Sequence, residues 1–453
     1  MARLVGRPRA WLVLLACSCV IAVAGDWLSF GGDPQHSGWQ RYGLRLTLST
    51  MKTFRLIWKR PLEGEFRAPV ILGPTVTHRG VRELALLQSA SDTLQAINVD
   101  FGKVFWQGRF DSKERAARPA CASGWPLPLP VIATDPEDDL GEPVADEDDN
   151  DDEPANMRPV YLLASDGRLH TVRPSDGTDI AEPLPFLPAG AVASDLNFAA
   201  DRVYAVTPDG CGTAPSGVWS IEVKKPNARP VFFAVKGSTA SGGVTIGLDD
   251  TVYTARGDEV LSLTADKLQR KSSFTMQEAV RIQPVALQWK SRLLVIAGGR
   301  HSLLLLDGEK LARLAEADGA GEEFAGGLAS WEDPQGTRWI YASTAKKVLA
   351  YRLRGTPSGP RLERAWASDD MEAPGASVVT HGVMLVLAGG TASPPSPAVL
   401  YAFDAANGRQ LFASGNSIAK PVRAPQLALA NGHVFFKSDE NVVYCFGIPI
   451  DKE

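Results

Sequence analysis

The residue types that usually do chemistry are scattered through this chain rather than grouped. Its six histidines are His36, His78, His170, His301, His381 and His433, and their spacing does not indicate the convergence that a metal site needs. His78, His381 and His433 fall at equivalent hairpin turns, where we expect solvated side chains. The sequence also lacks the G-x-S-x-G, H-E-x-x-H, Walker and G-x-G-x-x-G motifs. No catalytic residue and no metal ligand is therefore predicted.

The acidic residues are concentrated in one run. Residues 135–153 hold twelve Asp and Glu and no base, and without them the net charge of −5 becomes −5 + 12 = +7. Carboxylates suit Ca²⁺, but the glycine and the ordered spacing of a Ca²⁺-binding loop are missing. We predict a solvated, disordered insert at about residues 135–157, with an electrostatic contact to a basic partner as the alternative. The overall charge indicates no nucleic-acid partner.

The first 24 residues resemble an export signal. Three arginines precede an apolar stretch from Trp11 to Ala24, and Ala22-Val23-Ala24 fits the cleavage pattern of a signal peptide. Fourteen apolar residues are too few for a transmembrane helix, which needs about 20, and no later stretch is longer. We expect an exported protein, periplasmic or extracellular. Leu14-Leu15-Ala16-Cys17 also resembles a lipobox, so a membrane-anchored lipoprotein lipidated at Cys17 is the alternative.

Three cysteines remain after residue 24. Cys121 and Cys211 lie in glycine-containing loop sequence, whereas Cys445 lies in an apolar strand, Val-Val-Tyr-Cys-Phe. An exported protein meets an oxidising compartment, and a buried free cysteine behaves as a small hydrophobic residue. The predicted disulfide is therefore Cys121–Cys211, and the alternative is three unpaired thiols.

The rest of the chain is a repeat of short strands. Apolar runs of four to seven residues are separated by Gly, Asp, Asn and Pro, and one unit of strand, turn and strand recurs about every 45 residues. Its copies begin at Leu94, Leu169, Val218, Val260, Leu303, Val348, Leu400 and Val443. This period predicts an all-β fold, an eight-bladed β-propeller with four antiparallel strands per blade. Residues 25–453 are predicted to form this single domain.

The ring is predicted to close through its N-terminal strand. The last copy ends at Ile450 without a fourth strand, and the segment FRLIWKRPLEG at 54–64 resembles the fourth strand of the first blade. An N-terminal strand in that position removes an unpaired edge. We therefore expect Phe54 to Leu62 to pair with the strand at about Val442 to Ile448.

The repeat unit resembles the tryptophan-docking repeat of the PQQ-type eight-bladed propellers, A-x-D-x-x-T-G-x-x-x-W. The matching residues are Ala96, Asn98, Gly102 and Trp106 in the first copy, Asp176 and Gly177 in the second, and Ala402, Asp404, Asn407, Gly408 and Phe412 in the seventh. Asp26-Trp27-Leu28-Ser29-Phe30-Gly31-Gly32-Asp33 also resembles the start of quinoprotein dehydrogenases. The resemblance implies structural roles for these residues, with the Trp stacked between blades. Trp58, Trp106 and Trp366 are expected there, and Trp289, Trp331 and Trp339 are expected in the core, as is Trp125.

The resemblance leaves two classes of function open. Quinoprotein dehydrogenases hold PQQ and Ca²⁺ in the channel, many with a disulfide between adjacent cysteines, but this chain has neither adjacent cysteines after residue 24 nor a Cys-x-x-Cys-His haem motif. We therefore expect no cofactor, and a monomeric, non-enzymatic binding or assembly scaffold of the cell envelope, like the outer-membrane assembly lipoproteins of this repeat class. Its protein partner is unidentified, and residues 107–157 are the first candidate surface. The alternative is a PQQ- and calcium-dependent dehydrogenase or a degenerate relative.

Overall fold

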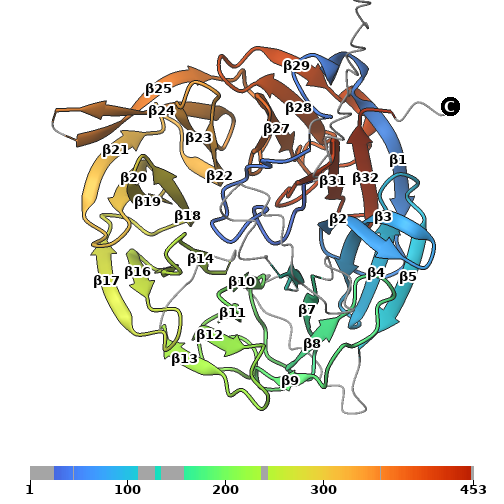
Figure 1. Ribbon diagram of the computed structural model, residues 1–453. Coiled ribbons are helices and arrows are strands. Elements are labelled where there is room, and N and C mark those ends of the chain that lie inside the picture. Colours follow the sequence, from blue (N-terminus) through green and yellow to red (C-terminus); the bar gives the residue numbers. More distant parts are fainter. Residues whose placement is uncertain are drawn as a thin grey trace, which may run out of the picture.

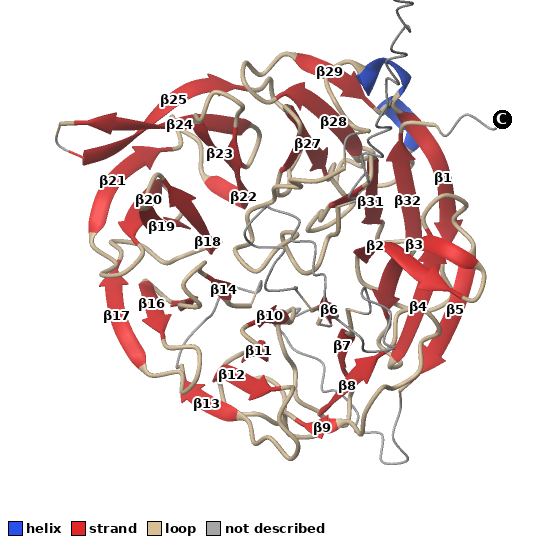
Figure 2. Ribbon diagram, viewed as in Figure 1, coloured by secondary structure: helices blue, strands red, loops and turns tan. Residues whose placement is uncertain are grey.

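The fold is a ring of eight four-stranded antiparallel sheets around a central channel (Figure 1). The computed structural model describes residues 25–43, 45–110, 128–133, 158–235, 243–357 and 359–449. Residues 1–24 with Cys17, the acidic run, Cys121 and Trp125 lie outside the described residues. Within these ranges helix is limited to two short 3-10 turns, η1 (Thr50–Thr53) and η2 (Gly415–Ser417), and strands make up the blades (Figure 2). The predicted fold class is confirmed.

The blades follow one another along the chain, and each runs from the channel outward. Blade one holds β2 (Val70–Thr77), β3 (Gly80–Gln88), β4 (Thr93–Asn98) and β5 (Val104–Arg109); blade two holds β6 (Val131–Ile132), β7 (Val160–Leu163), β8 (Arg168–Val172) and β9 (Leu184–Pro185); blade three holds β10 (Asn197–Ala199), β11 (Arg202–Thr207), β12 (Gly217–Glu222) and β13 (Val231–Ala234); blade four holds β14 (Thr245–Ile246), β15 (Val252–Arg256), β16 (Glu259–Leu263) and β17 (Arg270–Thr275).

The second half of the ring repeats this order and then breaks it at the last blade. Blade five holds β18 (Ile282–Trp289), β19 (Arg292–Gly298), β20 (Ser302–Asp307) and β21 (Arg313–Asp318); blade six holds β22 (Phe324–Glu332), β23 (Arg338–Thr344), β24 (Val348–Thr356) and β25 (Gly359–Ala367); blade seven holds β26 (Val378–Thr380), β27 (Val383–Ala388), β28 (Val399–Asp404) and β29 (Gln410–Ala413); blade eight holds β30 (Ala428–Ala430), β31 (His433–Lys437), β32 (Val442–Gly447) and, from the other end of the chain, β1 (Arg55–Pro61).

The closure of the ring is the predicted one. Strand β1 pairs antiparallel with β32, from Arg55 opposite Gly447 to Pro61 opposite Val442. The N-terminal strand thereby covers an edge that would otherwise expose unpaired backbone groups. Cys445 lies opposite Trp58 in this pairing and is a buried free thiol, as its apolar surroundings in the sequence indicated.

Tryptophans in the outer strands of blades eight, one and six dock each of these blades onto the next. The indole Nε1 of Trp58 donates to the Val99 carbonyl at 2.7 Å, that of Trp106 to Pro174 at 2.7 Å, and that of Trp366 to Ala405 at 3.0 Å. Each ring lies against a glycine of the neighbouring turn with positive φ; these glycines are Gly102, Gly177 and Gly408. A Cβ on any of them would come within 2.4–2.7 Å of the ring, so the pattern needs glycine and tryptophan together.

The three tryptophans in the described part of the chain that were expected in the core are buried. Trp289, Trp331 and Trp339 are 9%, 5% and 5% exposed and belong to the packed interior of blades five and six. They contribute to packing and are not available as surface anchors. In the ranges that the structure describes, no helix is long and apolar enough to cross a membrane.

Candidate functional site

The channel is occupied by the chain's own N-terminal segment. Residues 25–43, called the channel segment below, run inside the ring before the chain reaches β1 (Figure 1, dark blue). Within it, residues 27–40 hydrogen-bond to the innermost strand of every blade. The bonds are Trp27 with Ile71 of β2 in both directions, Ile132 N–H of β6 to Leu28, Asn197 Nδ2 of β10 and Ile246 N–H of β14 to Pro34, Ala286 N–H of β18 to Gln35, Ser330 N–H of β22 to Ser37, Val379 N–H of β26 to Gly38, and Gln40 Nε2 to Leu429 of β30.

These bonds explain why the segment takes this path. The innermost strand of each blade has an unpaired edge that faces the channel, and buried backbone groups need partners. The donor–acceptor distances are 2.7–3.1 Å, within the range of sound hydrogen bonds. One short segment therefore satisfies backbone groups of seven blades and the Asn197 side-chain amide of blade three, and it closes the channel at that level.

The turn at the centre of the segment is organised by Asp33. Its carboxylate accepts hydrogen bonds from the backbone N–H and the hydroxyl of Ser37, and from Arg41 at 2.8 Å. Gly38 follows with φ of 65°, and a Cβ there would lie 2.9 Å from the Cβ of Ala329 and 3.0 Å from the Ser377 carbonyl. The glycine thus allows the segment to approach blades six and seven closely.

His36 is buried inside this arrangement. Its side chain is 2% exposed and lies edge-on to Phe30 at 5.3 Å between ring centroids. The Nε2 atom lies 3.3 Å from the amide of Asn197, and Nδ1 lies 3.2 Å from the hydroxyl of Thr245. Burial lowers the pKa of His36 from 6.5 to about 4, although the Asp33 carboxylate opposes this shift. The imidazole is therefore neutral at physiological pH and has a packing role.

Gln40 anchors the end of the segment. Its amide nitrogen donates to the carbonyls of Leu429 and Asp26 at 3.0 and 2.6 Å, and its oxygen accepts the N–H of Tyr42 at 3.0 Å. The side chain is 4% exposed. A glutamate here would place a negative charge against two carbonyl oxygens, so the site specifies an amide.

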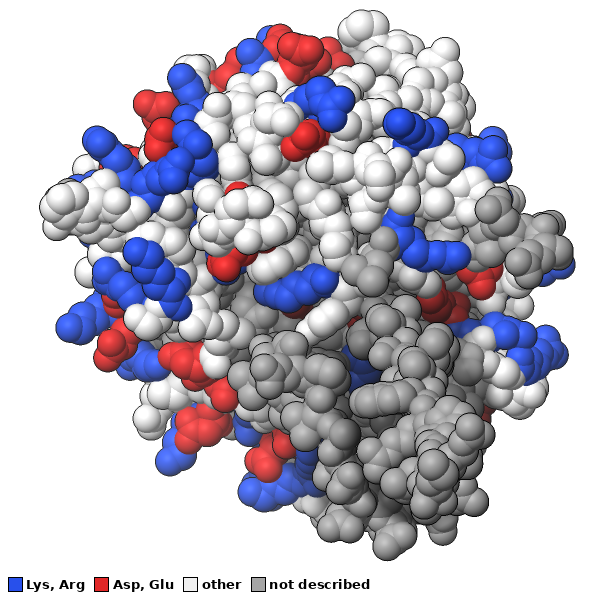
Figure 3. Space-filling model, turned by 45° about the horizontal axis from the view of Figure 1, so that its top comes forward, with Lys and Arg blue, Asp and Glu red and all other residues white. Residues whose placement is uncertain are grey.

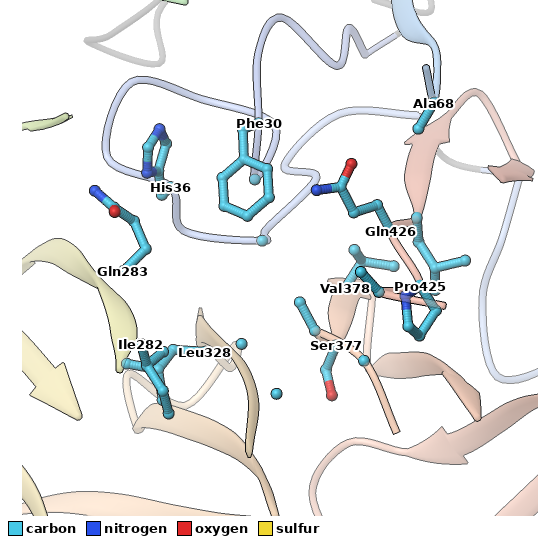
Figure 4. Close-up of a pocket in the computed structure, with 18 of the residues that line it drawn as sticks. Phe30, His36, Ala68, Ile282, Gln283, Leu328, Ser377, Val378, Pro425 and Gln426 are labelled. Carbon is cyan, nitrogen blue, oxygen red and sulfur yellow. The ribbon is translucent and has the colours of Figure 1, made fainter. Parts of the chain in front are cut away.

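A cavity of about 270 Å³ lies on one side of the channel segment. Figure 4 shows Phe30 of the segment facing Ile282, Leu328, Val378 and Pro425, with the amides of Gln283 and Gln426 on opposite sides. The lining comes mainly from the segments at the beginnings of the innermost strands of blades five to eight. Arg281 is the one charged residue among the described residues of the lining, and it is exposed. The cavity is therefore largely apolar, with amides and a single cation.

An ion pair with a buried carboxylate and a partly exposed guanidinium joins blades one and three beside this cavity. One guanidinium nitrogen of Arg67, before β2, lies 3.0 and 3.1 Å from the two carboxylate oxygens of Asp195, before β10. Leu129 N–H donates to the same carboxylate at 2.8 Å. Burial raises the pKa of Asp195, while Arg67 and the Leu129 N–H oppose the rise. The guanidinium of Arg67 and the N–H of Leu129 already engage this carboxylate, which limits its use as a base or a ligand.

The residues expected from the docking repeat are not at the cavity. Ala96 and Asn98 lie at the end of β4, Trp106 in β5, Ala402 and Asp404 at the end of β28, and Phe412 in β29, all in the third and fourth strands of their blades; Asp176, Gly177 and Gly408 lie in the turns that join such strands. Asp176 accepts hydrogen bonds from Thr178 N–H and Oγ1, and Asp404 from Ala406 N–H and the Asn407 amide. They organise the turns that receive the tryptophans.

The expectation of solvated turn histidines is only partly correct. His78 is exposed, but His433 is 1% exposed and burial lowers its pKa to about 4. His381 is half-buried, and burial lowers its pKa as well. Both side chains lie at turns that pack against neighbouring structure, which the hairpin position alone does not reveal. Arg67, Asp195, Gln283 and Gln426 were not singled out in the sequence, because no motif marks them.

The lining does not fit PQQ with Ca²⁺. The cofactor is a tricyclic quinone that carries several carboxylates, and its metal needs oxygen ligands of high charge. The described lining offers one cation, Arg281, beside apolar side chains. Within the described ranges no group of three or more His, Cys, Asp or Glu is placed to hold a metal ion. No catalytic step through such a cofactor follows from these residues.

Comparison with known proteins supports the fold assignment. No protein-family model and no curated protein matches the chain. Among solved structures, it is similar to the quinohemoprotein alcohol dehydrogenase of Comamonas testosteroni, with a TM-score of 0.60, 12% identity, and coverage of 94% of this chain and 81% of the other. For the quinohemoprotein alcohol dehydrogenase ADHIIG of Pseudomonas putida HK5, the TM-score is 0.61 and the identity 11%, and the match covers 94% of this chain and 81% of the other. For BamB of Moraxella catarrhalis, the TM-score is 0.45 and the identity 13%, and the match covers 65% of this chain and 94% of the other. At such identities the likeness concerns the fold alone, an eight-bladed β-propeller.

Proposed function

We propose that this chain is an exported, non-enzymatic propeller that acts as a binding or assembly scaffold in the cell envelope. The observation that carries the proposal is the channel segment, which hydrogen-bonds to all eight blades. A segment held in this way makes the ring rigid and occupies the space where a propeller enzyme would hold its reacting groups. What remains for function is the set of loops on the two faces, and loops on a rigid scaffold commonly carry binding.

The composition of the cavity supports the same proposal. Its apolar side chains and amides can bind part of another molecule, but they offer no activated nucleophile and no pair of titratable groups with opposed pKa shifts. Asp195, the carboxylate beside it, is engaged by Arg67 and Leu129. Binding without chemistry is the simplest use of such a surface.

The experiment is a dye-linked dehydrogenase assay. Purified protein lacking residues 1–24 is incubated with PQQ and Ca²⁺ and then given primary alcohols or aldose sugars. We expect dye reduction no faster than in a sample without protein. Turnover that depends on both PQQ and Ca²⁺ would replace this proposal with the dehydrogenase alternative.

Export is tested separately from activity. The full chain is expressed in a Gram-negative host, the envelope is fractionated, and the mature N-terminus is sequenced. A chain that begins at Gly25 supports cleavage by ordinary signal peptidase, and a chain that begins with lipidated Cys17 supports the lipoprotein alternative. Retention of the whole N-terminus in the cytosol contradicts export.

A further inference from the structure

One hairpin of the ring projects beyond the others. Strands β24 and β25 of blade six pair from Leu349 opposite Ala367 to Thr356 opposite Gly359, with one register shift between Ala350 and Tyr351, and Figure 1 shows the hairpin extending outward from the circle of blades. Strand β23 accompanies β24 only as far as Arg352. Beyond that residue the hairpin is a two-stranded ribbon without a third strand in the described structure.

The two faces of this ribbon differ in character. Leu353 and Leu362 are 3% and 7% exposed and pack into the interior of blades five and six. Gly355 lies beside Trp289 of blade five. Alternate residues of a strand point to opposite faces, so Arg354 and Arg361 lie on the other face, and both are exposed. The inner face holds the ribbon in place, and the outer face is exposed at Arg354 and Arg361.

The outer face carries unbalanced positive charge. Its charged residues are Arg352 and Arg354 on β24 and Arg361 and Glu363 on β25. Glu363 pairs with Arg352 at 3.0 Å and with Arg354 at 3.4 Å, and Arg361 has no ion-pair partner in the described part of the chain. Arg354 and Arg361 stand directly opposite each other, an arrangement of like charges that disfavours the pairing. In Figure 3, blue side chains gather with some red ones at the left edge, the side on which this hairpin projects.

We propose that this outer face docks an extended acidic segment of a protein partner. Arginine forks bind carboxylates well, and an anion between Arg354 and Arg361 would relieve their repulsion. Successive residues on one face of a strand lie about 6.6–6.8 Å apart, so a partner with acidic residues at alternate positions matches the spacing along β24. The inference rests on the proposed binding function, because it takes the partner to be a protein.

The size of the patch sets the character of the contact. Four charged side chains on a narrow ribbon cannot bury the roughly 800 Å² per partner of a standard interface. The contact is therefore a weak one that steers and orients a partner, and it depends strongly on salt. A larger interface elsewhere on the ring would supply most of the affinity.

The experiment measures peptide binding by fluorescence anisotropy. The probe is a labelled peptide, Glu-Val-Asp-Val-Glu-Val-Asp, and its neutral counterpart has Gln and Asn in place of the acids. We expect the protein to bind the acidic peptide at least about tenfold more tightly at low salt, and to lose most of this preference when the salt is raised to about 0.3 M. The variant Arg354→Glu/Arg361→Glu is expected to lose the preference altogether.

A matched control distinguishes the effect of the hairpin arginines from the effect of the protein's net charge. The variant Lys310→Glu/Arg409→Glu makes the same change in net charge at exposed sites on other blades, and it is expected to keep most of the preference. Circular dichroism checks that both variants keep the parent fold. Equal binding of the two peptides by the parent, or equal weakening by the two variants, overturns the proposal.

A third result also overturns it. If the hairpin variant leaves peptide binding unchanged but self-associates with rising concentration, the arginines serve to prevent edge-to-edge pairing of strands. None of these failures bears on the dehydrogenase assay, so loss of this inference and loss of the proposed function are distinguishable.

Discussion

Protonation of His36 should loosen the channel segment, and the variant His36→Asn isolates this effect. His36 is 2% exposed, and its φ of 56° lies in the left-handed region, which asparagine tolerates better than most residues. The substitution therefore keeps the backbone path while it removes the group that titrates. Asparagine loses the contact with Phe30, so the variant is less stable at every pH. The informative quantity is how its difference from the parent changes with pH.

The magnitude follows from the pKa. Burial lowers the pKa of His36 from 6.5 to about 4, so between these values the unfolded chain binds a proton that the folded chain does not. The stability that the folded protein has with a neutral His36 is fully present above pH 6.5 and is lost as the pH falls towards 4. With about 1.4 kcal/mol per pH unit, the parent loses about 3 kcal/mol across this window because of His36 alone. The variant does not have this loss.

The assay is urea unfolding of parent and variant at several pH values from 7.5 to about 4.5. Subtracting the free energy of unfolding of the variant from that of the parent at each pH cancels the effect of carboxylates that titrate in the same range. We expect the stability advantage of the parent to shrink by about 2–3 kcal/mol over this range. The control His301→Asn removes an exposed histidine outside the channel and is measured in the same way. Parallel curves for the parent and His36→Asn would refute the placement of His36 inside the channel.

Three further predictions address the ring closure, a buried carboxyl and the disulfide. Trp58→Phe leaves the Val99 carbonyl without its indole donor and should lower the free energy of unfolding by about 1–2 kcal/mol; a loss below about 0.3 kcal/mol in urea titration would contradict the docking of the closing strand. Burial and, less strongly, Asp100 raise the pKa of Glu83 from 4.5 to about 7, so the fold loses stability as the pH rises from 4.5 through 7, where the unfolded chain ionises first. Glu83→Gln should therefore stabilise the protein by about 3 kcal/mol at pH 8 and leave it unchanged near pH 4.5, and equal unfolding curves at pH 8 would count against it. Cys121 and Cys211 should be linked, with Cα atoms about 4.4–6.8 Å apart, and non-reducing peptide mapping that finds both as free thiols would remove this prediction.

The architecture was predictable because the amino-acid sequence repeats the same pattern of strands and turns. A unit that recurs about every 45 residues must bury its faces against copies of itself, so the number of blades follows from the number of copies. The missing fourth strand after Ile450 and the matching segment at 54–64 then predicted the closure, and β1 pairs with β32 as expected. The periodic hydrophobicity and the last repeat copy that lacks a fourth strand can both be seen in the sequence.

The channel was not predictable in the same way. The bonds between the channel segment and the blades are mostly made by backbone groups, and backbone groups leave no mark on the choice of residue. His36 and His433 were expected to play no special part, and the prediction that turn histidines are solvated is wrong for His433, because long-range packing decides burial. Arg67 and Asp195 lie 128 positions apart in the chain, so no local pattern could join them.

The most direct test of the account is a titration of the protein with PQQ in the presence of Ca²⁺, in which binding is monitored through tryptophan fluorescence. A channel closed by residues 27–40 and lined by apolar side chains and amides should show no saturable change beyond that of free tryptophan mixed with the same cofactor. Saturation at one PQQ per chain, abolished by removal of Ca²⁺, would contradict the account and identify the channel as a cofactor site.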